Sequence, residues 1–364
     1  MTLLPPAVSA GEMTTPRSTR VPAPAASATH IPQLDGWRGV SIACVLLAHM
    51  FPLGPKEWEL NTTAGAVGMA VFFTLSGFLI TSFLRERPAV GDFLIRRGCR
   101  ILPLALLYLA VALTVAGASP WTWAASFGFV LNYSHDAIIP WTSPFWSLCV
   151  EIHFYLLIAG VVAVLGRRGL FVLPPLAVLV TMARVVTDSP MSIYTHLRVD
   201  EILAGATLAL AWGSGKDGRW AGVFRRTPPW LAGVVLLLTS SPWCGPLQYA
   251  RPYAAALLVG TTLFQERHWL SRQLLRPSLK YLANVSYALY VLHPMTFRGW
   301  MDTGSTVERY LIKRPVSLAV LFTLAHLSTK YWEAWWIRLG KRLTRRAERR
   351  VLGLGVQQPE GVSP

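Results

Sequence analysis

Apolar segments separated by short, mostly basic loops constrain the fold of this 364-residue chain more than any other feature. The hydrocarbon core of a bilayer is about 30 Å thick and is crossed by about 20 predominantly apolar residues in a helix. Several segments are shorter than this, so we expect their helices to extend into the flanking loops. The ten segments predicted to cross a membrane are 37–53, 65–84, 101–118, 144–165, 170–187, 199–213, 230–241, 252–265, 279–297 and 316–337.

The composition also indicates a membrane protein. Hydrophobic residues make up 53% of the chain and charged residues 14%, and the mean hydropathy is +0.41. Soluble domains usually carry about 25% charged residues. The 15 tryptophans and 11 tyrosines suit the two interfaces of a bilayer. The predicted fold is therefore all-α, a polytopic transmembrane helical bundle in the inner (plasma) membrane.

The basic residues predict the orientation of the bundle, because loops rich in Lys and Arg stay on the cytoplasmic side. An eleventh apolar run, 121–139, either crosses or forms a re-entrant segment. If it does not cross, both termini are cytoplasmic and the basic loops lie inside, whereas a crossing there would put the basic tail outside. We therefore favour ten crossings. The exception is the outside loop 298–315, which has four basic residues. The inside loops are 85–100, 166–169, 213–226 and 265–280.

The net charge of +16 does not indicate nucleic-acid binding, because the basic residues lie in loops and in the C-terminal tail. Seven residues from Arg338 to Arg350 are Lys or Arg, which is typical of a tail on anionic membrane lipid. We divide the chain into an N-terminal tail (1–31), a membrane domain (32–340) and a basic cytoplasmic tail (341–364). The N-terminal tail lacks an apolar signal-peptide core and is expected to be disordered. The four cysteines have no metal-ligand spacing, so no metal site is predicted.

Two ionisable residues share one face of the first apolar helix. Arg38 and His49 are eleven positions apart, which returns them to within roughly 20° of each other around the helix and separates them by roughly 16 Å along it. On the predicted orientation, the guanidinium lies at the cytoplasmic end and the imidazole near the middle of the membrane. Ionisable groups in a bilayer are costly and mark candidate functional sites. Imidazole suits a general base near neutral pH, so we predict a functional role for His49.

A second polar face occurs in the segment that begins at Pro144. Ser147, Glu151 and Tyr155 follow one another at helical spacing, whereas His153 points the other way. Glu151 and His49 are expected at nearly the same depth, which makes Glu151 a candidate partner of the imidazole. The alternative is that Glu151 only hydrogen-bonds to a neighbouring helix, and the cost of a buried carboxylate favours the functional interpretation.

The remaining polar residues of the predicted spans have simpler interpretations. Arg96, Arg97 and Arg100 anchor a helix at the cytoplasmic side and can also hold phosphate groups. Ser286, Tyr290 and His293 share a helix face that either lines a cavity or joins helices. Small residues such as Gly77 are interpreted as helix-packing positions. In the last predicted span, three polar residues share one helix face and are interpreted as structural: His326, Lys330 and Glu333. The last two are expected to neutralise each other.

Five segments together resemble the membrane-bound acyltransferase-3 family, the integral-membrane O-acyltransferases of bacterial saccharides and related natural products. The resemblance covers residues 32 to 340, and the motifs occur in the family's order. It is carried by LDGWRGVSIACVLLAH, VFFTLSGFLI, RRGCRILP, PFWSLCVEIHFYLL and NVSYALYVLHP. One departure is that Ile152 and His153 stand where the family usually has a second glutamate and a glutamine. This leaves Glu151 as the only carboxylate of that motif.

The resemblance implies transfer of an acyl group, most often acetyl, from cytoplasmic acyl-CoA to a hydroxyl of a saccharide, with no bound cofactor. His49 is then expected to act as general base, or to carry the acyl group in an acyl-histidine route, with Glu151 assisting. The residues expected to bind acyl-CoA are Arg38, Arg96, Arg97 and Arg100. Those expected to contact the acceptor are Ser147, Tyr290 and His293.

Several alternatives stay open at this stage. The acceptor could be a small natural product such as a macrolide instead of a saccharide. A proton-coupled carrier would also use buried His and Glu residues, but the sequence has no matching halves of the kind that carriers show. An inert flippase or scaffold of the same family is a third option. Because no hydrolase-like domain follows the last apolar segment, we expect the enzyme to finish the transfer itself or to pass the acyl group to a partner protein on the outer face.

Overall fold

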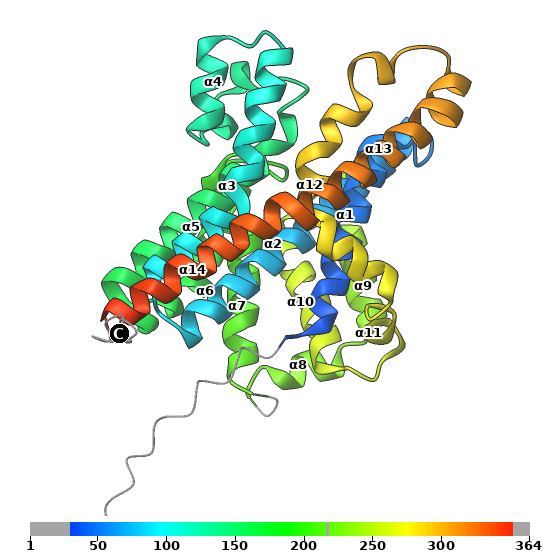
Figure 1. Ribbon diagram of the computed structural model, residues 1–364. Coiled ribbons are helices and arrows are strands. Elements are labelled where there is room, and N and C mark those ends of the chain that lie inside the picture. Colours follow the sequence, from blue (N-terminus) through cyan, green and yellow to red (C-terminus); the bar gives the residue numbers. More distant parts are fainter. Residues whose placement is uncertain (1–29, 216–217, 352–364) are drawn as a thin grey trace, which may run out of the picture. The chain divides into compact units, whose positions relative to one another are not determined.

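The computed structural model describes residues 30–215 and 218–351, and every regular element in this part of the chain is a helix. The all-α prediction is therefore confirmed. Most of the predicted N-terminal tail and the last 13 residues of the predicted basic tail lie outside the described residues. Figure 1 shows the helices in chain order.

Each predicted apolar segment coincides with helical structure. The ends of the helices either lie within a few residues of the predicted ends or extend beyond them. Short 3₁₀ turns join several of these helices, including η2 (Leu131–Tyr133), η3 (His135–Ala137), η4 (Ser143–Phe145) and η6 (Thr195–Leu197). The α-helices are α1 (Pro32–Met50), α2 (Leu60–Glu86), α3 (Val90–Val115), α4 (Pro120–Phe127), α5 (Trp146–Leu165), α6 (Leu173–Val186), α7 (Asp200–Gly213), α8 (Ala221–Arg226), α9 (Pro229–Ser240), α10 (Arg251–Phe264), α11 (Trp269–Gln273), α12 (Pro277–Phe297), α13 (Arg314–Leu327) and α14 (Ala334–Val351).

Four helical stretches of the described residues are long and apolar enough to cross a membrane, and the broken pair α9–α10 brings the number to five. These helices identify a membrane protein. The eleventh apolar run, 121–139, is not one long helix, because it divides into α4 and the turns η2 and η3. At the other end of the chain, α13 and α14 are joined through a π-helical turn (Ser328–Glu333), so the last helix continues past the predicted end of the span at 337.

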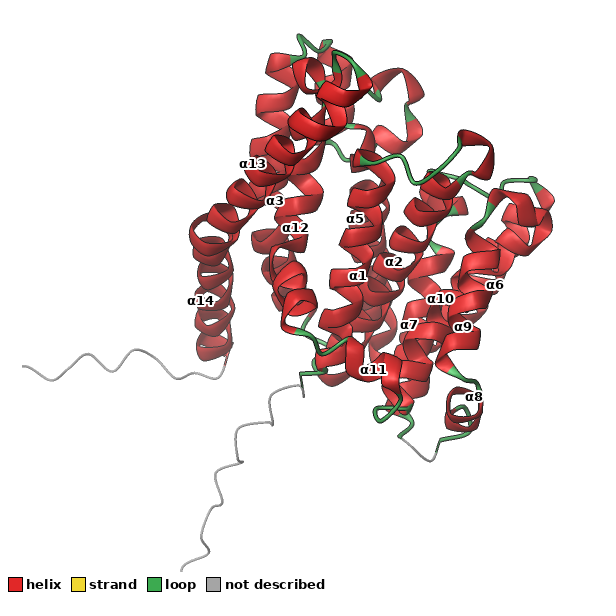
Figure 2. Cartoon of the chain, turned by 90° about the vertical axis from the view of Figure 1, so that its right-hand side faces the viewer, coloured by secondary structure: helices red, strands yellow, loops and turns green. Residues whose placement is uncertain are grey.

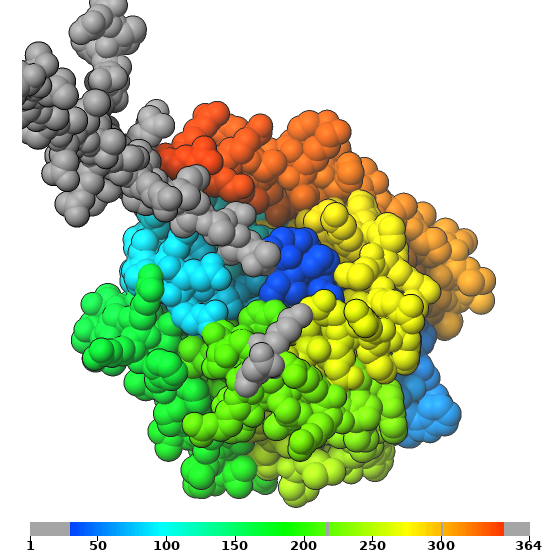
Figure 3. All heavy atoms as spheres, turned by 90° about the horizontal axis from the view of Figure 1, so that it is seen from below, coloured from blue at the N-terminus to red at the C-terminus, as the bar shows by residue number. Residues whose placement is uncertain are grey.

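Helix α1 lies in the interior of the bundle and packs against α2 and α12. Figure 3 views the face where α1 begins, and the blue start of this helix is surrounded by the cyan, green and yellow segments. Its core contacts are made by Ile42, Val45 and Leu46, which are all buried. A helix in this position presents its polar residues to other helices instead of to lipid, and this is how Arg38 and His49 reach a protein-lined site.

Helices α2 and α7 cross closely, and two glycines allow this contact. A Cβ atom added to Gly77 would lie 1.8 Å from the carbonyl oxygen of Ile202, and one added to Gly205 would lie 2.0 Å from that of Thr74. Real Cβ atoms do not approach backbone atoms this closely, so the two helices touch through their backbones. The interpretation of Gly77 as a packing position agrees with this contact.

The basic segments gather at one end of the bundle. Figure 2 shows the start of α1, the short helices α8 and α11 and the C-terminal end of α14 at the same end, with the 3₁₀ turns around α5 at the other. The basic segments that contain α8, α11 and the end of α14 therefore share one end of the described bundle (Figure 2).

Candidate active site

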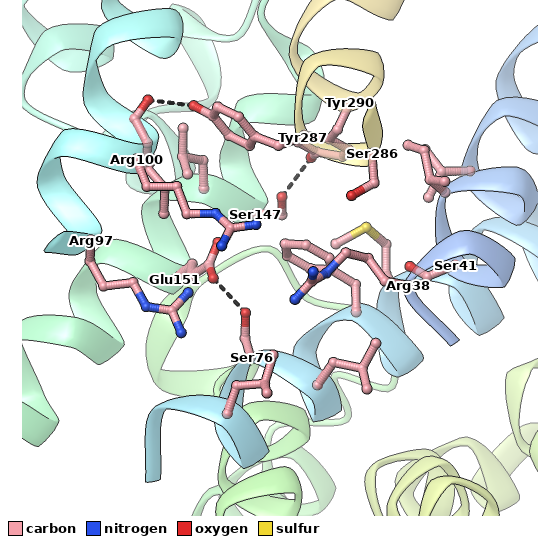
Figure 4. A pocket seen from close by; sticks show the side chains of 18 residues that line it. Arg38, Ser41, Ser76, Arg97, Arg100, Ser147, Glu151, Ser286, Tyr287 and Tyr290 are labelled. Carbon is pink, nitrogen blue, oxygen red and sulfur yellow. Dashed lines mark hydrogen bonds between the residues drawn. The ribbon is translucent and has the colours of Figure 1, made fainter. Parts of the chain in front are cut away.

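A narrow cavity of about 60 Å³ lies beside the first half of α1, and we call it the arginine cavity. Arg38 of α1 and Arg97 and Arg100 of α3 line it. Figure 4 shows the three guanidinium groups pointing into this space from two helices. The α12 residues Ser286 and Tyr287 complete the wall. Arg38 Nη1 also lies 3.7 Å from Oδ1 of Asp35. Three guanidinium groups around one small cavity suit phosphate or another anion.

Glu151 supplies a carboxylate to the same cavity. Its Oε1 atom accepts hydrogen bonds from the hydroxyls of Ser76, at 2.5 Å, and Tyr155, at 2.6 Å. The side chain of Arg97 lies over the Tyr155 ring, with its guanidinium carbon 5.6 Å from the ring centroid. Glu151 therefore balances part of the charge of the arginines. The expectation that it contacts His49 is wrong, because Glu151 bonds to Ser76 and Tyr155, whereas His49 lies against His293.

A wider cavity of about 480 Å³ lies beside the second half of α1, and we call it the histidine cavity. His49 lines it, together with Asn61 of α2, Trp146 at the start of α5 and Arg198 before α7. His49 is exposed, whereas its neighbour His293 on α12 is completely buried. The cavity is large enough for a sugar-sized group, and it presents an accessible imidazole to that group.

The partner of His49 is His293. Their rings are inclined by only 12°, and His49 Nδ1 lies 3.2 Å from His293 Nε2. His293 Nδ1 donates to the carbonyl oxygen of Tyr290 at 2.7 Å, which leaves Nε2 of a neutral His293 as an acceptor. The proton between the rings then belongs to His49 Nδ1, and His49 Nε2 keeps its lone pair. The second histidine thus sets the tautomer that a general base requires.

Asn61 holds the end of α1 in place beside the histidine cavity. Its side-chain amide donates to the carbonyl oxygens of Ala48, at 2.8 Å, and Phe51, at 2.6 Å, and its Oδ1 accepts from the Leu53 amide. The last carbonyls of a helix have no partner within the helix. Asn61 satisfies such groups and thereby fixes the backbone on both sides of His49.

The two cavities adjoin in the middle of the bundle, where both are lined by Val45, Met69 and Tyr290. The Tyr290 hydroxyl is 2.5 Å from Ser147 Oγ and also donates to the carbonyl oxygen of Pro144. Ser147, Tyr290 and His293 are thus brought together, although Ser147 bonds to Tyr290 and to the Pro144 carbonyl and has no base beside it. The α12 face that carries Ser286, Tyr290 and His293 therefore lines the cavities through Ser286 and Tyr290, and it joins α12 to α5 through the bond of Tyr290 to Ser147.

Two other expectations differ from the structure. Arg96 does not line the arginine cavity, because its Nε atom donates to Thr344 of α14 at 3.2 Å. The pairing of Lys330 with Glu333 is also wrong. Glu333 accepts from Ser328 and Thr329, and the ammonium group of Lys330 lies over the Tyr331 ring. The π-helical turn between α13 and α14 changes the spacing on which both the stripe and the pairing were based.

Three residues that line the cavities were not predicted from the sequence: Ser76, Asn61 and Arg198. Ser76 stands next to a packing glycine, and Asn61 precedes the predicted start of its span, so neither carried a periodic signal. Arg198 did carry a different signal, because it forms a cluster of charged residues with Asp200 and Glu201 at the start of an apolar segment. Within the described part of the chain, no group of His, Cys, Asp or Glu residues is arranged to hold a metal ion.

The chain is similar to bacterial O-acetyltransferases. It is 31% identical over 223 residues to the "Putative peptidoglycan O-acetyltransferase YrhL" of Bacillus subtilis, covering 50% of this chain and 33% of that protein. It is 26% identical over 223 residues to the O-acetyltransferase OatA of Staphylococcus aureus, covering 51% and 35%. The matches thus span about a third of the length of these relatives, and no solved structure matches the chain. A family model described as an acyltransferase domain matches residues 31–338, and the chain therefore belongs to the acyltransferase-3 family.

Proposed function

We propose that this protein is an inner-membrane O-acetyltransferase that moves an acetyl group from cytoplasmic acetyl-CoA to a hydroxyl of a cell-envelope saccharide. The observation that carries the proposal is the pair of adjoining cavities, one lined by three arginines and the other by an accessible histidine. The names of the relatives, a peptidoglycan O-acetyltransferase among them, support a saccharide acceptor.

The donor binds in the arginine cavity. Coenzyme A carries several phosphate charges, and Arg38, Arg97 and Arg100 provide guanidinium groups that pair with phosphate oxygens. The cavity is narrow, so the bulky nucleotide stays at the arginines while the thin thioester arm extends towards Tyr290. The basic loops at this end of the bundle agree with delivery of the donor from the cytoplasm.

The acceptor hydroxyl binds in the histidine cavity, beside His49. His49 Nε2 removes the hydroxyl proton, and the oxygen attacks the thioester carbonyl carbon. The carbon–sulfur bond then breaks, and the protonated imidazole returns its proton to the leaving thiolate, giving the acetyl ester and free coenzyme A. Throughout the reaction, His49 Nδ1–H donates a hydrogen bond to His293 Nε2, which holds the ring of His49 in place and stabilises its imidazolium form.

Transfer of label from acetyl-CoA tests this function. Membranes containing the wild-type protein are incubated with labelled acetyl-CoA, and label in the saccharide fraction is measured. Removing a general base costs about 10²- to 10⁴-fold, so the His49→Ala protein should lose at least about 100-fold of the transfer rate. The Arg38→Ala protein should need more acetyl-CoA for half-maximal labelling and recover at saturation.

His326→Ala is the matched control. His326 is an exposed histidine on α13 that lines neither cavity, so its removal should leave labelling unchanged. Unchanged labelling by the His49→Ala protein would overturn the assignment of the base, and the absence of label with wild type would overturn the function itself.

A further inference from the structure

A group of buried charged residues adjoins the histidine cavity where α6, α7 and α10 meet. Arg184 Nη1 pairs with Asp200 Oδ2 at 2.5 Å, and Arg251 Nε pairs with Glu201 Oε1 at 2.7 Å. Arg198 Nη2 lies 3.4 Å from the other oxygen of Glu201. All five side chains are 3% exposed or less. Because an uncompensated charge is very costly when it is completely buried, the stability of this group depends on how well its positive and negative charges balance.

The group holds three guanidiniums and two carboxylates, so it carries one positive charge in excess. Arg184 and Arg251 each have a carboxylate at hydrogen-bond distance, and both also donate to the carbonyl oxygen of Pro190. Arg198 shares its carboxylate with Arg251 at a longer distance, and its Nε atom donates to no described residue. The excess charge therefore resides on Arg198.

Arg198 is also the member of the group that lines the histidine cavity. Its guanidinium carbon lies 5.5 Å from the centroid of the Trp146 ring and 6.0 Å from that of Phe73. Aromatic rings offset only part of a buried cation's desolvation. Arg184 and Arg251 have a structural explanation, since they fasten the loop before η6 to the helices, but Arg198 makes no bond of that kind.

We propose that Arg198 binds a carboxylate of the acceptor, and that the protein therefore acts on acidic saccharides. This inference rests on the proposed function and specifies its substrate class. A carboxylate carries one negative charge at neutral pH, which matches the single excess positive charge, and its two oxygens suit the planar guanidinium. The same cavity holds His49, so a carboxylate on Arg198 orients a neighbouring hydroxyl of the same sugar towards the base.

The first test compares two forms of one acceptor. The saccharide fraction that accepts label from wild-type membranes is divided before labelling. The carboxyl groups of one half are chemically reduced to alcohols, and the other half is kept in its native form. A charge-assisted hydrogen bond in a buried site is worth about tenfold or more in binding, so wild type should label the native half at least about tenfold faster at limiting concentration. Arg198→Gln should label both halves equally slowly, and Arg198→Lys should keep a preference for the native half.

The second test measures binding without transfer. An oligosaccharide of glucuronic acid should raise the melting temperature of the purified wild-type protein, and its carboxyl-reduced form should not. The Arg276→Gln protein, which lacks an exposed arginine outside both cavities, should behave as wild type. Equal labelling of both saccharide halves by wild type, a native-half preference that survives in Arg198→Gln, or equal stabilisation by both oligosaccharides would each overturn the proposal.

The two tests separate this proposal from the proposed function. If wild-type membranes label no saccharide, acetyl transfer is wrong, and the melting experiment still decides whether the histidine cavity recognises a carboxylate. If Arg198→Gln does not fold, the wild-type comparison and the Arg198→Lys protein decide the question, because neither depends on that variant.

Discussion

At the scale of single residues, the two histidines of the site divide the work between them. His49 is accessible in the wide cavity, and His293 is buried behind it with its own Nδ1 proton committed to the Tyr290 carbonyl. A base needs both access to the substrate and a defined tautomer. One residue supplies the access and the other the tautomer, so the two positions should respond differently to substitution.

We expect His293→Phe to lower the turnover number by about tenfold or more and to leave the KM for acetyl-CoA unchanged. The phenyl ring of the variant still fills the space between α1 and α12. The imidazolium of His49, however, loses its hydrogen bond to His293, which is worth about 1.5–3 kcal/mol. Initial rates at saturating and limiting acetyl-CoA check this. A changed KM with an unaltered turnover number would contradict the role of His293.

Replacement of Glu151 should affect the arginine cavity more than the base. Glu151→Ala removes the carboxylate that lines the arginine cavity together with Arg97 and Arg100, and it removes the acceptor of Ser76. Loss of one partner from a buried charged set destabilises by about 3–5 kcal/mol, and Glu151→Gln, which keeps the acceptor oxygen, should lose less. Thermal unfolding of the purified proteins measures the difference. If Glu151→Gln were as stable as the wild type, charge balance would not be the role of Glu151, because glutamine keeps an acceptor oxygen and removes only the charge.

At the scale of helices, the contact between α2 and α7 positions both cavities, because α2 carries Ser76 and Asn61 while Arg198 precedes α7. We expect Gly77→Ala to destabilise the protein by about 1–3 kcal/mol or more, since the added methyl group overlaps the Ile202 carbonyl. Melting temperature and the yield of folded protein report the effect.

Gly65 provides the control for this substitution within the same helix. A Cβ atom at Gly65 would lie 3.5 Å from Ala48, which is an ordinary contact, so Gly65→Ala should change stability by less than about 0.5 kcal/mol. Similar losses in both variants would show that helix α2 is sensitive to any added side chain, and that the α2–α7 crossing has no special importance.

At the scale of the whole described bundle, the two cavities lie beside opposite halves of α1, and this arrangement requires a defined orientation in the membrane. Labelling of single cysteines with an impermeant maleimide tests it in a variant that lacks the four native cysteines. Ser305→Cys, beyond the end of α12, should react in intact cells. Ser278→Cys, near its beginning, should react only after permeabilisation. The reverse pattern would invert the proposed route of the donor.

Much of the fold and part of the site could be predicted from the sequence. The positions of the helices follow from apolar segments, and the shared face of Arg38 and His49 follows from the helical repeat, because both are properties of one continuous stretch of chain. Motif order predicted the family. Four residues that were predicted for the site from motifs of the family line the arginine cavity together: Arg97, Arg100, Ser147 and Tyr290.

The partners across helices could not be predicted in this way. Depth along the membrane suggested Glu151 for His49, but depth does not determine which helix faces which, and packing put α12 beside the end of α1 instead. The π-helical turn after α13 removed the expected pairing of Lys330 with Glu333 for a related reason, because a local change of helical repeat rotates every later side chain.

The helices, the family and the residues that share a helix face could be predicted from the amino-acid sequence, because they depend on local periodicity and on short motifs. Packing between helices established that His49 is paired with His293, that Arg96 lies outside the arginine cavity, and that Arg198 is the buried cation beside the histidine cavity. These relations join residues up to 248 positions apart. They depend on how side chains interlock between helices, and the pattern within any one helix does not contain that information.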